Sequence, residues 1–141
     1  MPWDICEENP KHEILNPKQA QMAKMQNSKQ YDLEQRTLKF AKEVIKFVKV
    51  LPMSVANAEM AKQLIRSAGS IGANYIEANE SLSKKDFLMR IKICRKESKE
   101  AAYWLKLVEA KDRDEEKGRG LLIAEATELM KIFGSIVEKA K

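Results

Sequence analysis

Side chains suited to acid–base or nucleophilic chemistry are scarce in this sequence. It contains one histidine, His12, and two cysteines, Cys6 and Cys94, in 141 residues. A Ser-His-Asp or Cys-His centre needs an imidazole held beside its nucleophile. His12 falls in a polar stretch without regular apolar spacing, where we expect it to be solvated. Cys94 falls on the apolar side of a predicted helix, which favours a buried, unreactive residue. We therefore predict no catalytic residues and no enzymatic activity.

Metal and nucleotide sites also lack their usual patterns. A carboxylate-bridged metal site in a helical bundle requires Glu-x-x-His pairs, and the sequence has none. It has no Walker loop and no Gly-x-Gly-x-x-Gly motif. The stretch AGSIGAN, residues 68–74, contains two glycines but lies inside a helical pattern rather than after a strand. We expect no metal ion and no cofactor.

Positive charge is the more promising chemical feature. Lys and Arg outnumber Asp and Glu by 26 to 21. Two stripes of basic residues follow helical spacing. The first basic stripe consists of Lys39, Lys42, Lys46 and Lys49. The second basic stripe consists of Lys85, Lys92, Arg95, Lys96 and Lys99. One such stripe can serve solubility alone, but two on a small domain favour contacts with the phosphates of RNA or DNA. Tyr103 and Trp104 are expected to be partly packed, so the predicted binding is electrostatic and sequence-tolerant.

One predicted helix, residues 55–80, carries two further patterns. A polar stripe places five residues on one face: Gln63, Ser67, Ser70, Asn74 and Glu77. It is either a solvated face or a hydrogen-bonded contact between helices or subunits. Gly69 and Gly72 lie on a side rich in small residues, although each helical glycine costs about 1 kcal/mol relative to alanine. Close packing inside the domain and contact between subunits both explain this pair.

Four amphipathic helices are expected to position these residues. Apolar side chains recur every three or four residues over 32–50, 55–80, from 83 to about 110, and from 115 or 121 to 140. Asp32 is the expected first cap, Pro52 ends the first helix, and Leu82 extends the apolar stripe of the second. The stretch KDRDEEKGRG, residues 111–120, is predicted to be a loop whose second half is helical if the last helix begins at 115. Short connections favour an all-α, antiparallel up-down-up-down four-helix bundle.

The N-terminal part differs in composition. Residues 1–30 hold three prolines and many polar residues, which indicates a flexible tail before a bundle domain at 31–141, with a short helix possible near 17–28. The acidic, polar start does not resemble a secretory signal, and the apolar runs are too short to span a membrane. We expect a cytoplasmic protein.

The stretch QLIRSAGSIGANYIEANESLSKKDFLMRIKICRKESKEAAYWLKLV, residues 63–108, resembles the four-helix-bundle family encoded by intervening sequences in bacterial 23S rRNA genes. The pattern Gln-Leu-x-Arg-Ser-x-x-Ser-Ile-x-x-Asn-x-x-Glu of that family matches Gln63, Leu64, Arg66, Ser67, Ser70, Ile71, Asn74 and Glu77. A Ser-to-Phe helix start matches 83–87, and the Trp-Leu pair matches Trp104 and Leu105. In the pattern of glutamates before that pair, Glu100 arrives one residue early.

The resemblance implies a subunit that assembles into a homopentamer. Our hypothesis is that the polar stripe of the 55–80 helix, with Arg66, Gly69 and Gly72, builds this assembly. It also implies similarity to the accessory protein of diversity-generating retroelements, which works with a reverse transcriptase and nucleic acid. The expected function is therefore a non-enzymatic, self-assembling, basic accessory protein that binds RNA or DNA. The alternative is an oligomeric protein-interaction scaffold with no nucleic-acid role.

Overall fold

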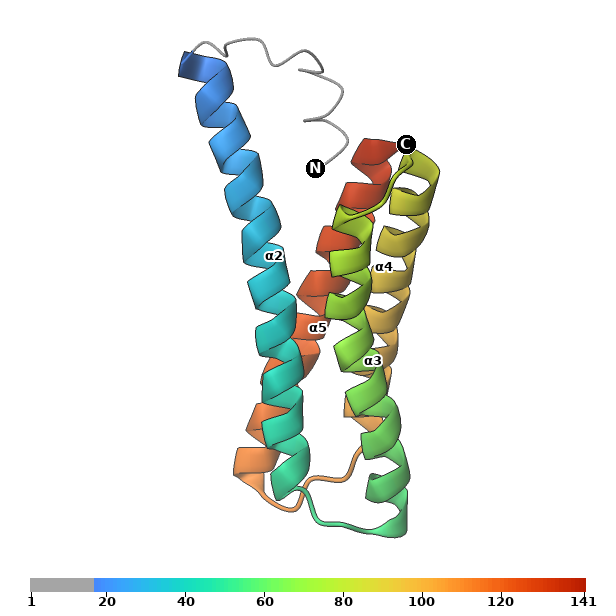
Figure 1. The fold of residues 1–141 in the computed structure, drawn as a ribbon. Coiled ribbons are helices and arrows are strands. Elements are labelled where there is room, and N and C mark those ends of the chain that lie inside the picture. The colour runs from blue at the N-terminus through green and yellow to red at the C-terminus, as the bar shows by residue number, and fades with distance from the viewer. Residues whose placement is uncertain (1–16) are drawn as a thin grey trace.

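Residues 17–141 fold into four helices that run alternately up and down. The computed structural model describes the backbone of residues 17–141 and the side chains from residue 33 onward. The helices are α2 (Pro17–Val50), α3 (Val55–Asn79), α4 (Lys84–Leu107) and α5 (Arg113–Ala140). Figure 1 shows that each helix returns beside the one before it, in the opposite direction. The predicted all-α four-helix bundle is confirmed.

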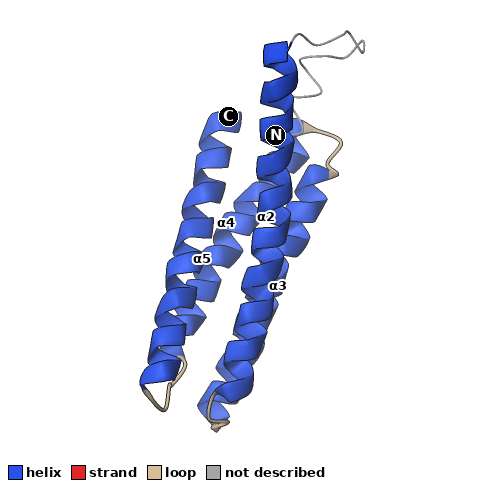
Figure 2. Cartoon of the chain, turned by 90° about the vertical axis from the view of Figure 1, so that its left-hand side faces the viewer, coloured by secondary structure: helices blue, strands red, loops and turns tan. Residues whose placement is uncertain are grey.

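The packing order fixes which helices are neighbours. α4 packs against α3 and α5, and α2 packs less extensively against the same two helices. α2 and α4 therefore occupy diagonally opposite corners. Figure 2, which views the molecule from the side of α2, shows α3 and α5 on either side and α4 behind. Residues of α2 and α4 that point away from the core consequently face opposite directions.

The core contains the apolar stripes of all four helices. Phe40, Leu64, Ile91 and Leu129, one from each helix, are fully or almost fully buried. The remaining buried apolar side chains extend this cluster along the bundle axis. Leu82 is an exception to the sequence-based prediction, because it lies in the turn between α3 and α4 and is 94% exposed. The spacing of Leu82 fits the apolar stripe of the helix, but α3 ends at Asn79. Leu82 therefore lies outside the helix, and helical spacing does not predict its burial.

Capping side chains set three of the helix starts. Ser54, Ser83 and Asp112 each accept a hydrogen bond from the backbone N–H three residues further on. The cap at Ser83 confirms the predicted start of α4. Asp112 begins α5 earlier than predicted, so most of the 111–120 stretch is helical rather than loop. Acidic residues in its first turn, which favour the positive end of the helix dipole, explain this start.

The first helix also begins earlier than its predicted start at Asp32. α2 starts at Pro17 and continues without interruption, so Asp32 lies inside the helix and does not cap it. Proline suits a first helical position because its missing N–H would have no partner there. The predictions that concern His12, Cys6 and the tail before residue 17 lie outside the described residues.

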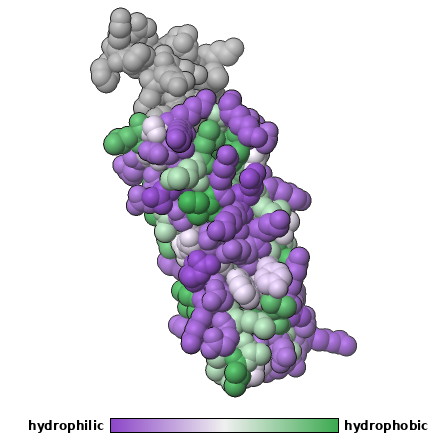
Figure 3. All heavy atoms as spheres, turned by 90° about the vertical axis from the view of Figure 1, so that its right-hand side faces the viewer, coloured by the Kyte–Doolittle hydropathy of each residue, from purple (hydrophilic) through white to green (hydrophobic). Residues whose placement is uncertain are grey.

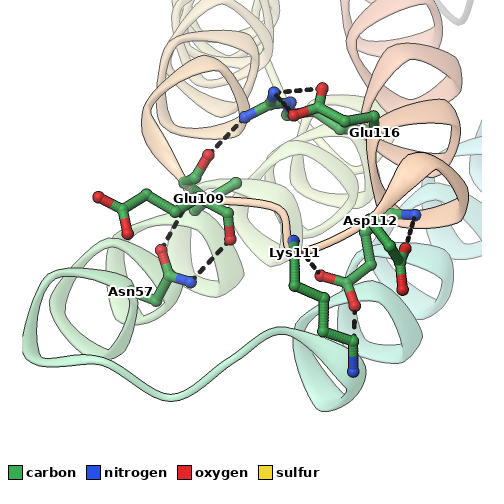
Figure 4. Close-up of polar contacts among 8 residues, drawn as sticks. Asn57, Glu109, Lys111, Asp112 and Glu116 are labelled. Carbon is green, nitrogen blue, oxygen red and sulfur yellow. Dashed lines mark hydrogen bonds and ion pairs between the residues drawn. The ribbon is translucent and has the colours of Figure 1, made fainter.

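Asn57 fixes the end of the bundle where α3 begins and α4 ends. Its amide group is buried and donates to the backbone oxygens of Pro52 and Glu109 at 2.8 and 2.9 Å, and its oxygen accepts from the Glu109 N–H at 2.8 Å. Figure 4 shows this pairing beside a second one, in which Arg119 bonds the Val108 carbonyl and Glu116. The two connecting segments at this end are therefore held by side chains.

Candidate nucleic-acid and assembly surfaces

The second basic stripe lies on the side of α4 that faces away from the core. All five of its residues, Lys85, Lys92, Arg95, Lys96 and Lys99, are exposed. None of them forms an ion pair with any side chain that the structure describes. Figure 3 views the molecule from the side where α4 lies in Figure 1 and shows hydrophilic side chains over much of that face. The positive charge of this stripe is thus available to a ligand.

The two glutamates of α4 that are next to this stripe in sequence are paired with α3. Glu97 and Glu100 turn towards α3, where Arg66 contacts both carboxylates at 3.6 and 3.1 Å. Asp86 lies in the first turn, where a negative charge complements the helix dipole. Lys106 and Tyr103 are exposed and continue the outward side of α4 by helical spacing. This separation of charge could not be read from the sequence, where Glu97 and Glu100 stand among the basic residues.

The first basic stripe lies at the opposite corner, on α2, in a more acidic setting. Its lysines are exposed, and Lys46 pairs with Glu43 at 3.6 Å. Lys39 and Lys46 also line a groove of about 1200 Å³ between α2 and α5. Five carboxylate side chains line the same groove: Glu43, Asp112, Asp114, Glu115 and Glu125. The two predicted basic stripes are therefore separate surfaces with different electrostatic surroundings.

The same groove contains a bidentate ion pair between α2 and α5. Its floor is partly apolar. Arg36 donates two hydrogen bonds of 2.8 Å to the carboxylate oxygens of Glu125. The buried rings of Phe40 and Phe47 form part of the lining, and Leu121 at its edge is 65% exposed. Bidentate pairs of this kind hold two helices in a defined position.

The polar stripe of α3 forms a seam against α4. Asn74 donates to the Ser70 hydroxyl at 2.9 Å and accepts from Arg90 of α4 at 3.0 Å. Ser67 is buried and donates to the Leu64 carbonyl of its own helix. Gln63 and Glu77, the ends of the stripe, are exposed. At Asn74 the stripe makes a hydrogen-bonded contact with α4, whereas Ser67 and Ser70 are bonded within α3.

Glu97 is an unusual member of this seam. Its side chain is 7% exposed, and its Oε2 atom has no hydrogen-bond partner among the described residues, although Arg66 lies 3.6 Å away. Burial raises the pKa of the Glu97 carboxyl above its usual value, and Glu100 adds to that rise while Arg66 opposes it. The carboxyl therefore accepts a proton more readily in the folded chain than in the unfolded one.

The two glycines of α3 have different surroundings. A Cβ atom at Gly72 would lie 3.1 Å from the Thr37 hydroxyl oxygen, so Gly72 allows α2 to approach closely. A Cβ atom at Gly69 would have no neighbouring atom within 4 Å. Packing inside the bundle explains Gly72, whereas Gly69 leaves a shallow, open position on the surface.

Exposed apolar side chains flank that open position. Leu38 and Ile45 of α2 are 54% and 40% exposed, and Ile65 and Ile76 of α3 are 41% and 51% exposed. Each pair shares one side of its helix by spacing, and the Thr37–Gly72 contact brings the two sides together. We call these four residues the α2–α3 apolar face. Apolar area of this kind on a charged protein often marks a contact surface.

Catalytic features are not evident in the described part of the chain. No group of three or more metal-ligating side chains occurs among residues that the structure describes. Cys94 is fully buried, with its Sγ atom 3.4 Å from the Ile71 carbonyl oxygen, and burial raises its pKa to about 12. The prediction of a buried cysteine is confirmed. Within residues 17–141, no helix has the length and apolarity needed to cross a membrane.

Comparisons with known proteins identify a family and a similar solved structure. The model of the 23S rRNA-intervening sequence protein family matches residues 29–135. The chain is also similar to a protein of unknown function from the S23 ribosomal protein family of Bacteroides thetaiotaomicron VPI-5482, solved as a crystal structure. That likeness has 31% identity and a TM-score of 0.64, and it covers 78% of this chain and 98% of the other. No match was found among curated proteins.

Proposed function

Because the chain belongs to the 23S rRNA-intervening sequence protein family, we propose that it is a non-enzymatic accessory protein that assembles with copies of itself and binds RNA or DNA through phosphate contacts. The observation that carries this proposal is the second basic stripe, whose exposed cations form no ion pair in the described structure. The family description, which refers to an rRNA gene, adds support for a nucleic-acid context.

The geometry of the second basic stripe suits an extended polyanion. Lys85 and Lys99 are fourteen positions apart in α4, which corresponds to about 21 Å at the rise of an α-helix. Flexible lysine side chains on a straight helix can follow a phosphate backbone without reading bases. The first basic stripe can add long-range attraction, but its acidic neighbours reduce its contribution.

The test is the salt dependence of binding. Fluorescence anisotropy with the full chain and a labelled RNA or DNA oligonucleotide should show affinity falling steeply between about 50 and 200 mM salt. Charge reversal of both stripes should abolish binding without loss of the helical circular-dichroism signal. Affinity that does not change with salt would contradict the phosphate mechanism, and absent binding at low salt would reject the nucleic-acid role.

We place the self-association on the α2–α3 apolar face. The resemblance implies a homopentamer, and a closed ring uses a surface of one subunit against a different surface of the next. The open position at Gly69 between the apolar side chains would let a neighbouring subunit approach closely. Arg66, Gln63 and Glu77 are exposed on the same helix, on the side nearer α4.

Mass measurement in solution tests the assembly. Substitution of Ile65 and Ile76 by glutamate should convert the oligomer to monomers, because it places charge in the proposed contact. Leu82→Glu is the matched control, since Leu82 is exposed in a turn outside this face. A wild-type chain that sedimented as a monomer at micromolar concentration would reject self-association, and an unchanged mass in the double variant would reject this face.

The groove between α2 and α5 favours a second candidate function, a scaffold for a partner protein. Its apolar floor and mixed charged rim suit an amphipathic helix better than a polyanion. The partner that the resemblance implies is a reverse transcriptase or another ribonucleoprotein component. Charge reversal of the second basic stripe discriminates the two functions, because a scaffold would keep its protein partner and the nucleic-acid protein would lose its ligand.

A further inference from the structure

Tyr103 is an exposed aromatic residue at the end of the second basic stripe. It is 57% exposed, whereas the sequence led us to expect it to be partly packed. Within residues 33–141 it is the one aromatic side chain classed as exposed; Trp104 is half-buried and the others are buried. An exposed tyrosine ring presents an apolar face that a flat ligand can cover.

The neighbouring residue holds the Tyr103 ring in place. The ring centroids of Tyr103 and Trp104 are 5.2 Å apart with an interplanar angle of 72°, an edge-to-face arrangement. Trp104 packs against the hydrophobic core, so its position is fixed by the bundle. Tyr103 is therefore braced on one side by an ordered ring while most of its own surface remains accessible.

Cations flank Tyr103 on the outward side of α4, and the carboxylate of Glu100, which is also one turn before Tyr103, pairs with Arg66 of α3. Lys99 lies one turn before it and Lys106 nearly one turn after it, and both are exposed. Side chains three or four residues apart on a helix are neighbours at about 5–6 Å. Lys96, two turns before Tyr103, extends the positive charge in the same direction. A ring beside several free cations is the combination by which proteins bind unpaired nucleotides, with bases stacked on the ring and phosphates on the cations.

We propose that the outward side of α4 binds single-stranded nucleic acid, with one unpaired base stacked on Tyr103 and the adjoining backbone on Lys96, Lys99 and Lys106. This inference rests on the proposed nucleic-acid function and specifies its ligand. Bases inside a duplex are stacked on each other and cannot reach the ring. The surface therefore selects single strands without selecting sequence, because every base presents a face for stacking.

The experiment compares single-stranded and duplex ligands with the full-length chain. Anisotropy is measured at fixed low salt with a labelled oligouridylate RNA and with a labelled RNA duplex. Tyr103→Ala should weaken binding of the single strand by about tenfold or more, the usual effect of removing one stacking ring. The same variant should leave duplex binding almost unchanged, and Tyr103→Phe, which keeps the ring, should bind the single strand like the wild type.

Two controls separate base stacking from a general loss of surface contacts and from a loss of assembly. Met89→Ala removes another exposed side chain near the other end of α4 and should not change binding of either ligand. Mass measurement of Tyr103→Ala should give the wild-type oligomer. Equal binding of the single strand by Tyr103→Ala and wild type, equal losses for both ligands, or a changed oligomer would each reject base stacking. Absence of binding by the wild type would instead reject the proposed function itself.

Discussion

α2 and α4 look alike as sequences of basic residues but differ as surfaces. Each carries a basic stripe on its outward side, and the two stripes face opposite directions from diagonal corners of the bundle. On α4, the acidic residues turn towards α3 and contact Arg66, so the outward side retains its positive charge. On α2, Lys39 and Lys46 line a groove with five carboxylates. The positions of the nearby acidic residues therefore affect ligand binding more than the number of basic residues on one helix.

The largest expected effect is the difference between two sets of charge reversals. Lys92→Glu, Lys96→Glu and Lys99→Glu together on α4 should weaken RNA binding by at least about 100-fold, because they replace available cations by repulsive charges. Lys39→Glu, Lys42→Glu and Lys49→Glu on α2 should weaken it only a few-fold. Anisotropy at one fixed salt concentration measures both. Equal losses would show that the two surfaces are equivalent.

Neutral substitutions give a second, smaller effect on the salt dependence. Replacing Lys92, Lys96 and Lys99 by glutamine should reduce the slope of log affinity against log salt by about 2, since each phosphate contact on a single strand contributes about 0.7. The matched glutamine variant of Lys39, Lys42 and Lys49 should change the slope by less than about 0.7. A larger change on α2 than on α4 would reverse our ranking of the two stripes.

A third effect concerns how the two helices are held in the bundle. Arg36→Ala removes the bidentate pair with Glu125 and should lower the free energy of unfolding by about 1 kcal/mol, because both side chains are about one third exposed. Amide exchange should accelerate mainly in α2, which packs less extensively than α4. Lys62→Ala, whose ion pair with Glu59 is exposed on both sides, is the control and should cost less. Uniform acceleration throughout the bundle would contradict a local role for Arg36.

The smallest expected effect is a pH dependence on the α3 side of α4. The folded chain holds the Glu97 proton more tightly than the unfolded chain does. The protonated Glu97 carboxyl therefore adds to stability below the unfolded pKa, and this contribution is lost as pH rises through the raised folded pKa. Glu97→Gln should therefore gain stability relative to wild type as pH rises from about 4 to 7. Urea unfolding across this range measures the difference. A constant difference would contradict the burial of the Glu97 charge.

The sequence predicted the bundle well because helix formation and burial follow the same spacing. The stripes through Phe40, Leu64, Ile91 and Leu129 indicated both the helices and the core. The predictions were wrong at helix ends, because the spacing of apolar residues does not define where a helix begins or ends. Leu82 continues an apolar stripe beyond the end of its helix, and the charged stretch before Leu121 is helical because Asp112 caps it.

The candidate surfaces were less predictable, since they depend on pairs of helices. Sequence spacing placed the lysines of both stripes on outward sides but could not indicate that Arg66 draws Glu97 and Glu100 away from one stripe. The two glycines were indistinguishable until Thr37 was found beside Gly72. The exposure of Tyr103 was missed because Tyr103 and Trp104 are adjacent in sequence and similar in type, whereas a helix turns them by about 100° relative to each other.

Because Cys94 is buried, the reaction rate of its thiol can measure how often the bundle opens. A thiol with a pKa of about 12, shielded between α3 and α4, is protonated and inaccessible in the closed state. In a chain whose Cys6 is replaced by serine, the rate of alkylation will then report how often these helices separate. If binding of a ligand or assembly of an oligomer slows this separation, alkylation of Cys94 will become slower. The measurement needs no label added beforehand.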